Sequence, residues 1–416
     1  MSDPVSGAPG ATVRRVREAE LRRPATEFWS AVRAVRSAAP LRPVVVPVGQ
    51  AAGLICAGAV MAGRAVPGFR AAAVDGYAVS SGDCLAASPA AGVRLPVLGS
   101  VPGGGEPVAW RPRSAVKVMT GGRVPPGADA VVGWEDTDLG EEMVTIGVPV
   151  RPDSNVRAED EEVAVGQVLA TPGSVLTPPR LSALTATGIE SVVVIPRPRV
   201  GILTTGDELV GEGDPLGGGQ VVDSNRPLVA AFLRLSGIEV TAVARVGDDR
   251  DLTERTMRDM AQRCDVVVTT GGVSVGEHDW VRSVVEDCGE VEFWRVGMRP
   301  GKPLLYGRLD STPLLCLPGS PMSVLVCCYV FLGPLLDAVS GSAEPRRETV
   351  VPLCEPIVGT PGRVQLLAGW VDDHGFRPLR ERHPGLGQVA DTDGLAVIEE
   401  GGANEGDVIA FLPFVW

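Results

Sequence analysis

Between residues 198 and 340, apolar β-branched runs alternate with helix-like segments, and this alternation leaves few possible folds. Alternating strands and helices predict a parallel sheet with helices on both faces. In such sheets, ligands bind beyond the carboxyl ends of the strands, so a binding site is expected in the loops that follow the strands. The expected elements are strands at 200–204, 239–246 and 266–270 and helices at 227–236 and 252–263.

The loop after the third of these strands reads T-T-G-G-V-S-V-G-E-H-D-W over residues 269–280. Its glycines free the backbone, so that N–H groups can point at a phosphate. The loop also carries Glu277 and Asp279, and carboxylates repel phosphates unless a hard cation such as Mg²⁺ lies between them. The segment therefore predicts a phosphate site that also holds a cation.

Two further acidic segments belong to the same predicted edge of the sheet. T-T-G-D-E-L at 204–209 follows the first strand, and D-S-N-R-P at 223–227 precedes a helix. Capping of a helix N-terminus, by Asp207 in the first segment or by Asp223 in the second, explains each one taken alone. Because both belong to the edge where the glycine loop opens, they are also candidates for the site.

Two proline-stiffened loops offer groups that could bind an anion. R-P-G-K-P at 299–303 is either an ordinary surface turn or a loop whose prolines lower the entropy cost of fixing Arg299 and Lys302 around an anion. L-P-G-S-P-M-S at 317–323 precedes an apolar helix. It either only starts that helix or also holds a phosphate at the helix N-terminus.

Outside the α/β region, short β-like runs separated by proline and glycine dominate the sequence. Residues 61–150 predict a β-rich module, in which A-V-D-G-Y-A-V at 73–79 has the D-G signal of a hairpin turn. In the same module, M-T-G-G-R-V-P-P-G-A-D-A at 119–130 indicates a turn-rich connection. Residues 345–416 predict a small terminal β-barrel or sandwich.

Charge and cysteine content exclude several classes of partner. The formal net charge of −13 argues against a nucleic-acid binder, because phosphate backbones require basic patches. The eight cysteines contain no C-x-x-C pair and mostly lie among apolar residues, which is typical of buried thiols in a reducing cytoplasm. Three histidines and no clustered ligand set argue against a structural zinc site.

The termini and the longest apolar run bear on the location of the protein. Residues 1–25 are rich in arginine but have no apolar run behind them, so a loosely attached leader is expected rather than a secretory signal. Thr26 is expected to cap a short helix containing Phe28. The apolar run 324–336 is interrupted by Gly333 and Pro334 and predicts a core helix rather than a membrane span. A cytoplasmic protein without a membrane partner is expected.

Taken together, the motifs resemble those of the molybdopterin molybdenumtransferase (molybdenum insertase) family, to which MoeA proteins and the corresponding domain of animal gephyrin belong. The resemblance extends from about residue 26 to 412 and keeps the order and spacing of the family's motifs. The matching segments are V-D-G-Y-A, M-T-G-x-x-V-P-P-G-A-D-A-V-V, T-G-D-E-L, D-S-N-R, T-T-G-G-V-S-V-G-E-x-D, P-G-K-P and L-P-G-S-P-x-S.

This resemblance implies a multi-domain α/β plus β fold and a homodimer. In the family's dimers, the inserted module of one subunit faces the α/β domain of the other, which would place Asp75 and Thr120 over the loops at 205–320 of the partner. The implied parts are a flexible leader at 1–25, an elongated linking and dimerisation domain at 26–60 and 151–197, an inserted β-rich module at 61–150, a central molybdopterin-binding parallel α/β domain at 198–340 and a small C-terminal β-barrel at 341–416.

The resemblance also implies a reaction, the last step of molybdenum cofactor biosynthesis. Family members use adenylylated molybdopterin and molybdate, insert the metal and release AMP with Mg²⁺ present, and the implied further partner is the molybdopterin adenylyltransferase. The implied catalytic residues are Asp75, Thr120, Glu208, Asp279 and Lys302. The implied Mg²⁺ ligands are Glu208, Asp223 and Asp279. The implied pterin- and phosphate-binding residues are Thr205, Gly206, Asp223, Ser224, Gly271, Gly272, Ser274, Gly276, Arg299, Pro318, Gly319 and Ser320.

Five positions depart from the family's pattern. Ala72 replaces the hydroxyl residue three positions before Asp75, and in the segment 155–162 Asp160 replaces a glycine and Glu162 replaces a shorter acid. Arg299 stands where lysine is common, and Ser320 where asparagine is usual. Two alternatives therefore stay open: a diverged paralogue that serves as a scaffold or binding protein, and an enzyme acting on another adenylylated or phosphorylated substrate.

Overall fold

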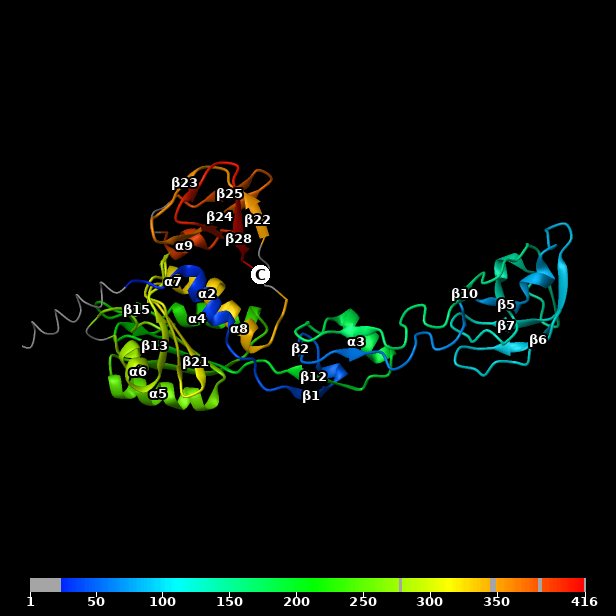
Figure 1. Cartoon of the computed structure of the whole chain (residues 1–416), viewed down its shortest axis with the longest axis horizontal. Helices are drawn as coiled ribbons and strands as arrows, with labels where there is room; N and C mark the ends of the chain where they lie inside the picture. Colours follow the sequence, from blue (N-terminus) through cyan, green and yellow to red (C-terminus); the bar gives the residue numbers. More distant parts are fainter. Residues whose placement is uncertain (1–23, 277–278, 345–348, 381–383, 415–416) are drawn as a thin grey trace, which may run out of the picture. The chain divides into compact units, whose positions relative to one another are not determined.

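The computed structural model describes residues 24–276, 279–344, 349–380 and 384–414, which fall into two compact units (Figure 1). The first unit joins residues 24–43 to residues 195–414, and the second is Val44–Val194. Each unit has hydrophobic cores of its own. The expected leader at 1–25 lies almost entirely outside the described residues, and the domain boundaries expected within each unit stay predictions.

A mixed sheet forms the centre of the first unit, with strand order β16-β13-β17-β21-β20-β18. The first four strands in this order are parallel, which confirms the parallel sheet and its three expected strands. Strand β20 is antiparallel to β21 because residues 310–311 alone separate them, too few for a crossover connection. The bounds are β13 (Val200–Thr205), β16 (Val240–Val246), β17 (Val266–Thr270), β18 (Glu290–Trp294), β20 (Leu305–Leu309) and β21 (Thr312–Leu317).

Helices cover both faces of this sheet, as the alternating sequence predicts. Figure 1 shows α5 and α6 on one face and α4 and α7 on the other. Successive strand residues supply the two cores, since Ile202 packs with α4 and α7 while Leu203 packs with α5 and α6. The bounds are α4 (Asn225–Leu235), α5 (Arg250–Arg263), α6 (Trp280–Cys288) and α7 (Pro321–Cys327).

The expected short helix near Phe28 is α2 (Phe28–Arg36), but its cap differs from the prediction. The carboxylate of Glu27 accepts hydrogen bonds from the N–H groups of Trp29 (2.8 Å) and Ser30 (2.7 Å). Thr26 is instead extended and bridges Val296 in a parallel β-type contact. Thr26 as the cap is therefore wrong, because its backbone is committed to this contact and Glu27 reaches the free N–H groups.

The apolar run at 324–336 forms part of a longer helix than expected. Helix α7 continues through a π-helical segment at Cys328–Leu332 into α8 (Gly333–Val339), so Gly333 and Pro334 do not break it. The wider turn accommodates Pro334, which has no N–H to donate and would crowd a regular α-turn. By length and composition, the 19 residues Pro321–Val339 could cross a membrane, but 72% of an apolar 18-residue stretch within them is buried in the protein. The expected core helix is confirmed.

Phe331 lies at the centre of this core and should carry a large share of the stability. Its side chain is fully buried, and its ring centroid lies 6.0 Å from that of Phe28 and 6.4 Å from that of Phe293. We expect Phe331→Ala to lower the free energy of unfolding by about 3–5 kcal/mol, measured by urea denaturation. Leu235→Ala, at a side chain that is 56% exposed, is the control, and equal losses for the two variants would contradict the prediction.

The C-terminal region folds as the expected small β-barrel, with strand order β19-β24-β26-β28-β22 and β25 paired to β24. A parallel bridge between Leu353, next to β22, and Phe376 of β25 closes the barrel. Strand β19 comes from the α/β region and pairs in parallel with β24. The terminal sheet is thereby attached next to the R-P-G-K-P loop. The bounds are β19 (Met298–Arg299), β22 (Thr349–Pro352), β24 (Val364–Asp372), β25 (Gly375–Pro378), β26 (Gly394–Ile398) and β28 (Val408–Pro413).

The second unit contains the predicted β-rich module, a sheet in the order β8-β5-β7-β6-β9. The D-G hairpin expected at 75–76 is wrong, because the strands on either side of the bend do not pair with each other. Before the bend, β4 (Ala71–Ala72) pairs with β10 (Val156–Arg157), and after it β5 begins at Gly76, which pairs with Gly133 on one side and Val118 on the other. A Cβ at Gly76 would overlap the carbonyl of Val132, so close strand packing requires the glycine. The bounds are β5 (Gly76–Val79), β6 (Val93–Val101), β7 (Ala115–Val118), β8 (Ala130–Gly133) and β9 (Met143–Ile146).

Candidate functional site

A cavity of about 330 Å³ opens where β13, β17 and β21 end. This is the edge at which the sequence predicts a ligand site, since four parallel strands place their carboxyl ends together. The predicted site residues that line the cavity are Thr205, Gly206, Glu208, Gly271, Gly272, Ser274, Gly276, Asp279, Pro318 and Gly319. Thr270, Asn225, Asp248 and Pro303 also line it and were not predicted.

Glycines form one wall of the cavity because the backbone there leaves no room for side chains. Gly271 and Gly272 have φ values of +88° and +66°, in the left-handed region that favours glycine. A Cβ at Gly271 would lie 2.6 Å from the carbonyl oxygen of Thr205, and one at Gly272 would lie 2.9 Å from a methyl carbon of Val281. The wall is therefore main chain, which can approach a phosphate closely.

Gly271→Ala tests how much this wall depends on glycine. Because the variant combines a left-handed alanine with a clash against Thr205, we expect it to lower the free energy of unfolding by about 1–3 kcal/mol or more. Gly219→Ala is the matched control, since Gly219 has φ +81° but open space around its Cβ position. Both are compared by urea denaturation. A loss at Gly271 no larger than at Gly219 would show that the contact with Thr205 does not matter.

Three carboxylates approach the cavity from three different loops. Asp279 accepts a hydrogen bond from the N–H of Gly276 at 2.5 Å. The side chain of Glu208 folds back over Gly206, and a Cβ added at Gly206 would lie only 2.5 Å from Oε2 of Glu208. Asp248 follows β16 and was missed by sequence reasoning. Asp248 could have been predicted as a site residue, because G-D-D-R at 247–250 follows a predicted strand in the same way as G-D-E-L at 206–209.

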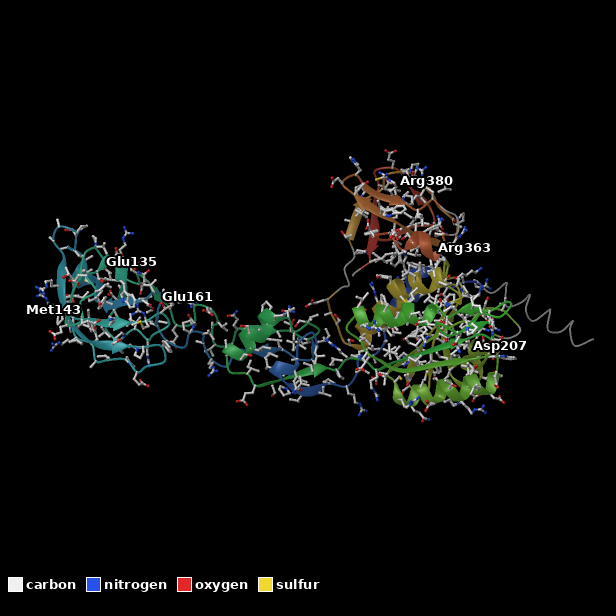
Figure 2. All side chains as sticks on the ribbon, turned by 180° about the vertical axis from the view of Figure 1, so that it is seen from behind. Glu135, Met143, Glu161, Asp207, Arg363 and Arg380 are labelled. Atoms are coloured by element: carbon white, nitrogen blue, oxygen red, sulfur yellow. The ribbon has the colours of Figure 1, made fainter. Side chains whose placement is uncertain are left out.

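The predicted role of Asp207 as a helix cap is wrong. The loop leads into strand β14 (Leu209–Val210), which pairs with β15 (Val221–Val222), and no helix begins there. The carboxylate of Asp207 instead accepts the N–H of Asp248 at 2.9 Å. This contact joins the loop after β13, where Figure 2 labels Asp207, to the turn after β16.

The D-S-N-R segment contributes Asn225 rather than Asp223 to the cavity. Asp223 is 2% exposed and does not line it, because its carboxylate accepts the hydroxyl of Thr204 (2.9 Å) and the N–H of Arg226 (3.1 Å). Ser224 precedes α4 and makes no side-chain capping bond. Asn225 donates through Nδ2 to the carbonyl of Gly319 (2.8 Å), while its buried Oδ1 has no partner among the described residues. Asp223 therefore holds the end of β13 and the start of α4 in place, and does not itself face the cavity.

The donor set suits a hard cation that arrives with a phosphate. Among the described residues, no three acidic, cysteine or histidine side chains are close enough to hold an ion by themselves. Mg²⁺ is usually bound through one or two carboxylates together with phosphate oxygens and water, so it needs no such cluster. Glu208, Asp248 and Asp279 all line the cavity and are the carboxylates that could take part in such binding. Glu277 and His278, also in the predicted loop, lie outside the described residues.

A group of cations adjoins the cavity. Lys302 immediately precedes Pro303, which lines the cavity, and its pKa is lowered by burial and by the positive charges of Arg295 and Arg363. Arg363 was missed by sequence reasoning, because it precedes β24 and comes close through the pairing of β19 with β24 (Figure 2). Clustered positive charges raise the free energy of the unliganded state, so an anion that neutralises them binds favourably.

Arg299 and Ser320 line a second, larger cavity of about 830 Å³. Its walls come from the proline loops and from the terminal sheet, and they include Ile357, Leu366 and Leu379. Ser320 follows Gly319 of the first cavity, and its hydroxyl donates to that of Ser323 at 2.7 Å. The two cavities therefore share the proline loops as neighbouring walls.

The remaining predicted catalytic residues, Asp75 and Thr120, belong to the second unit and contact each other. The carboxylate of Asp75 accepts hydrogen bonds from the N–H (2.7 Å) and the hydroxyl (2.8 Å) of Thr120. These bonds, the one from the N–H first, lower the pKa of Asp75 and keep it ionised.

The altered segment 155–162 also has a structural explanation. Asp160, which replaces a glycine, has φ +69°, and aspartate tolerates this left-handed conformation better than most residues. Arg157 binds the carboxylates of both Glu161 and Glu162. The departures therefore leave an ordered, ion-paired turn.

The fold and the cavity define a class of protein: a multi-domain binder of an anionic ligand at the edge of a parallel α/β sheet. Residues 201–338 match the model of a family described as "Probable molybdopterin binding domain", and residues 26–188 match "MoeA N-terminal region (domain I and II)". The first match contains every described loop of the cavity.

Relatives and solved structures agree with these models. The chain is 38% identical over 313 residues to Molybdopterin molybdenumtransferase 2 of Mycobacterium tuberculosis, covering 74% of this chain and 77% of the relative. It is 36% identical to Molybdopterin molybdenumtransferase of Haemophilus influenzae, covering 72% and 73%. A crystal structure of the molybdopterin biosynthesis MoeA protein of Pyrococcus horikoshii has a TM-score of 0.80 at 29% identity, covering 94% of this chain and all of that one. The chain belongs to the molybdopterin molybdenumtransferase family.

Proposed function

We propose that this protein, a transferase of molybdenum cofactor biosynthesis, inserts molybdate into adenylylated molybdopterin with Mg²⁺ present and releases AMP. The single observation that carries the proposal is the 330 Å³ cavity, where a main-chain wall suited to phosphate faces three carboxylates suited to a cation. Family membership supports the same reaction class, and no finding favours a scaffold or another adenylylated substrate.

The two sides of the cavity would divide the work of binding the substrate. N–H groups of the loop 271–276 would bind the pyrophosphate of adenylylated molybdopterin. Glu208, Asp248 and Asp279 would hold the cation, whereas Asp223 would fix Thr204 and Arg226 in place. A bound Mg²⁺ would neutralise the pyrophosphate and polarise its phosphorus for attack.

Molybdate would bind beside the cavity as the second substrate. Lys302, with Arg299 on the same loop, offers a positive site for an oxyanion close to the carboxyl edge of the sheet. The larger neighbouring cavity offers room for the part of the substrate that extends beyond the phosphates.

We further propose that the protein acts as a homodimer in the cytoplasm, with the molybdopterin adenylyltransferase as supplier of its substrate. In the dimer, the ionised Asp75, fixed by Thr120, would complete the site of the other subunit. All eight cysteines are free thiols, which supports a reducing compartment.

The proposal is tested by AMP release from purified protein given adenylylated molybdopterin and Mg²⁺, with and without molybdate. Release that depends on both molybdate and Mg²⁺ is the expected result. Tight binding of the adenylylated pterin without any release would overturn the enzymatic assignment and favour a binding protein. Release from a different adenylylated compound, with none from the pterin, would favour the second alternative.

A further inference from the structure

Hydrogen bonds connect the three loops that carry the cavity's carboxylates, and the carboxylates themselves take no part in these bonds. The main-chain N–H of Asp248 donates to the carboxylate of Asp207, and the main-chain carbonyl oxygen of Asp248 accepts the indole N–H of Trp280 at 2.9 Å. Asp207 is the neighbour of Glu208 in sequence, and Trp280 is the neighbour of Asp279. The main chain at Asp248 is thus held from both sides by residues adjacent to the other two carboxylates.

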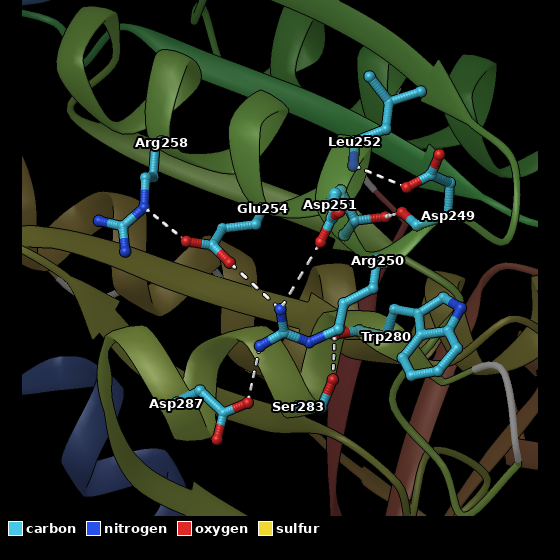
Figure 3. A network of polar contacts seen from close by, with 10 residues as sticks. Asp249, Arg250, Asp251, Leu252, Glu254, Arg258, Trp280, Ser283 and Asp287 are labelled. Atoms are coloured by element: carbon cyan, nitrogen blue, oxygen red, sulfur yellow. Dashed lines mark hydrogen bonds and ion pairs between the residues drawn. The ribbon is translucent and has the colours of Figure 1, made fainter.

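The glycine before Asp248 leaves room for the hydrogen bond between Asp207 and the N–H of Asp248. A Cβ at Gly247 would overlap Oδ1 of Asp207, so a larger residue there would displace that carboxylate from the N–H of Asp248. Behind the contact, Arg250 of α5 binds Asp287 of α6 at 2.8 Å and Glu254 at 3.4 Å (Figure 3). The start of α5 is therefore joined to the end of α6 independently of Trp280.

We propose that Asp207 and Trp280 are positioning residues that set the spacing of the carboxylates of Glu208, Asp248 and Asp279 for a divalent cation. This inference rests on the proposed function, which gives those three carboxylates to the cation. Three neighbouring negative charges repel one another, so without a rigid main chain the loops would move apart. Mg²⁺ demands near-ideal octahedral geometry, so its affinity depends on that spacing.

The expected effect of breaking the contact is a loss of metal affinity in a folded protein. Residues that orient metal ligands typically change affinity by about 10–100-fold when they are replaced. Trp280→Phe keeps an aromatic ring and removes the N–H donor, and Gly247→Ala displaces Asp207 while leaving both positioning residues in the chain. We expect either variant to raise the Mn²⁺ dissociation constant by roughly 10-fold.

The experiment titrates Mn²⁺ into the full-length protein in the presence of AMP and follows free Mn²⁺ by electron paramagnetic resonance. Trp370→Phe is the matched control, because it removes an indole bond of 2.8 Å to the carbonyl of Asp391 in the terminal sheet. A second readout is the Mg²⁺ concentration for half-maximal AMP release, which should rise while the KM for molybdate stays constant. If Asp207 and Trp280 only stabilised the fold, their loss would not change the Mg²⁺ requirement while leaving the KM for molybdate constant.

The outcomes distinguish this inference from the proposed function. Wild-type binding that Mg²⁺ competes away, weakened by Trp280→Phe and by Gly247→Ala but not by Trp370→Phe, supports the positioning role. Wild-type binding that both variants retain at full strength overturns it and leaves the proposed function intact. If the wild type binds no Mn²⁺ with AMP, the metal role itself is overturned and the positioning role with it. A variant that does not fold is recognised by its lost circular dichroism, and the other variant then decides.

Discussion

Asp279→Asn is expected to lower the single-turnover rate of molybdate-dependent AMP release by a factor on the order of 10²–10³, the usual cost of removing one electrostatic contact to a transition state. Asparagine can still accept the hydrogen bond from Gly276, so the loop keeps its shape. What the variant loses is the negative charge that would hold the cation against the pyrophosphate. The rate is measured at saturating pterin substrate, where binding differences do not contribute.

Asp249→Asn is the matched control for this change. Asp249 lies beside Asp248 but serves as the N-cap of α5, where its carboxylate accepts the N–H of Leu252 at 2.9 Å. Asparagine caps helices about as well as aspartate, so release by this variant should stay close to wild type. Equal losses at positions 249 and 279 would mean that general electrostatics, and not a metal ligand, explains the effect.

Lys302→Met is expected to raise the KM for molybdate roughly 10- to 100-fold, because a hydrogen bond to a charged group is worth about 1.5–3 kcal/mol. Methionine keeps much of the length of the side chain and removes the ammonium group. The prediction is checked by AMP release over a range of molybdate concentrations. An unchanged KM would place the oxyanion elsewhere.

Lys302→Arg provides the control through its pH dependence. The pKa of Lys302 lies below its ordinary value of 10.5, and a bound oxyanion would raise it again by favouring the charged form. Binding therefore takes up protons, and molybdate affinity falls as the pH rises through the lowered pKa. Arginine stays protonated, so the affinity of this variant should remain flat as the pH approaches 10.5. A parallel decline in both proteins would show that another group titrates.

Local sequence signals were sufficient for the architecture of the α/β region. Strand β17 and its glycine loop were predicted because β-branched residues and glycines have strong, short-range conformational preferences. The same preferences misled at Asp75-Gly76, where the turn signal marks the bend before β5 but the strands on either side of the bend pair with other strands. Gly76 is required there by the carbonyl of Val132, a contact across 56 residues that no local rule can register.

In the site as well, residues that directly follow a strand could be predicted from the sequence, whereas a residue brought in by distant strand pairing could not. Sequence order indicated Glu208 and Asp279, since each follows a strand that ends at the ligand-binding edge. Asp248 has an equivalent position in G-D-D-R after β16, so it could have been predicted by the same rule. Arg363 could not be predicted at all, because it reaches Lys302 only through the pairing of β19 with β24. Asp223 looks like a metal ligand in sequence, yet its partners Thr204 and Arg226 account for it.

The central claim is that the cavity at the end of the parallel sheet carries out metal insertion. It is tested most directly by measuring, in one turnover, the AMP released and the molybdenum that remains bound to the pterin product. The account predicts equal amounts of the two, with both lost in Asp279→Asn. AMP release without bound molybdenum would contradict it and would show that the protein only hydrolyses an adenylylated compound.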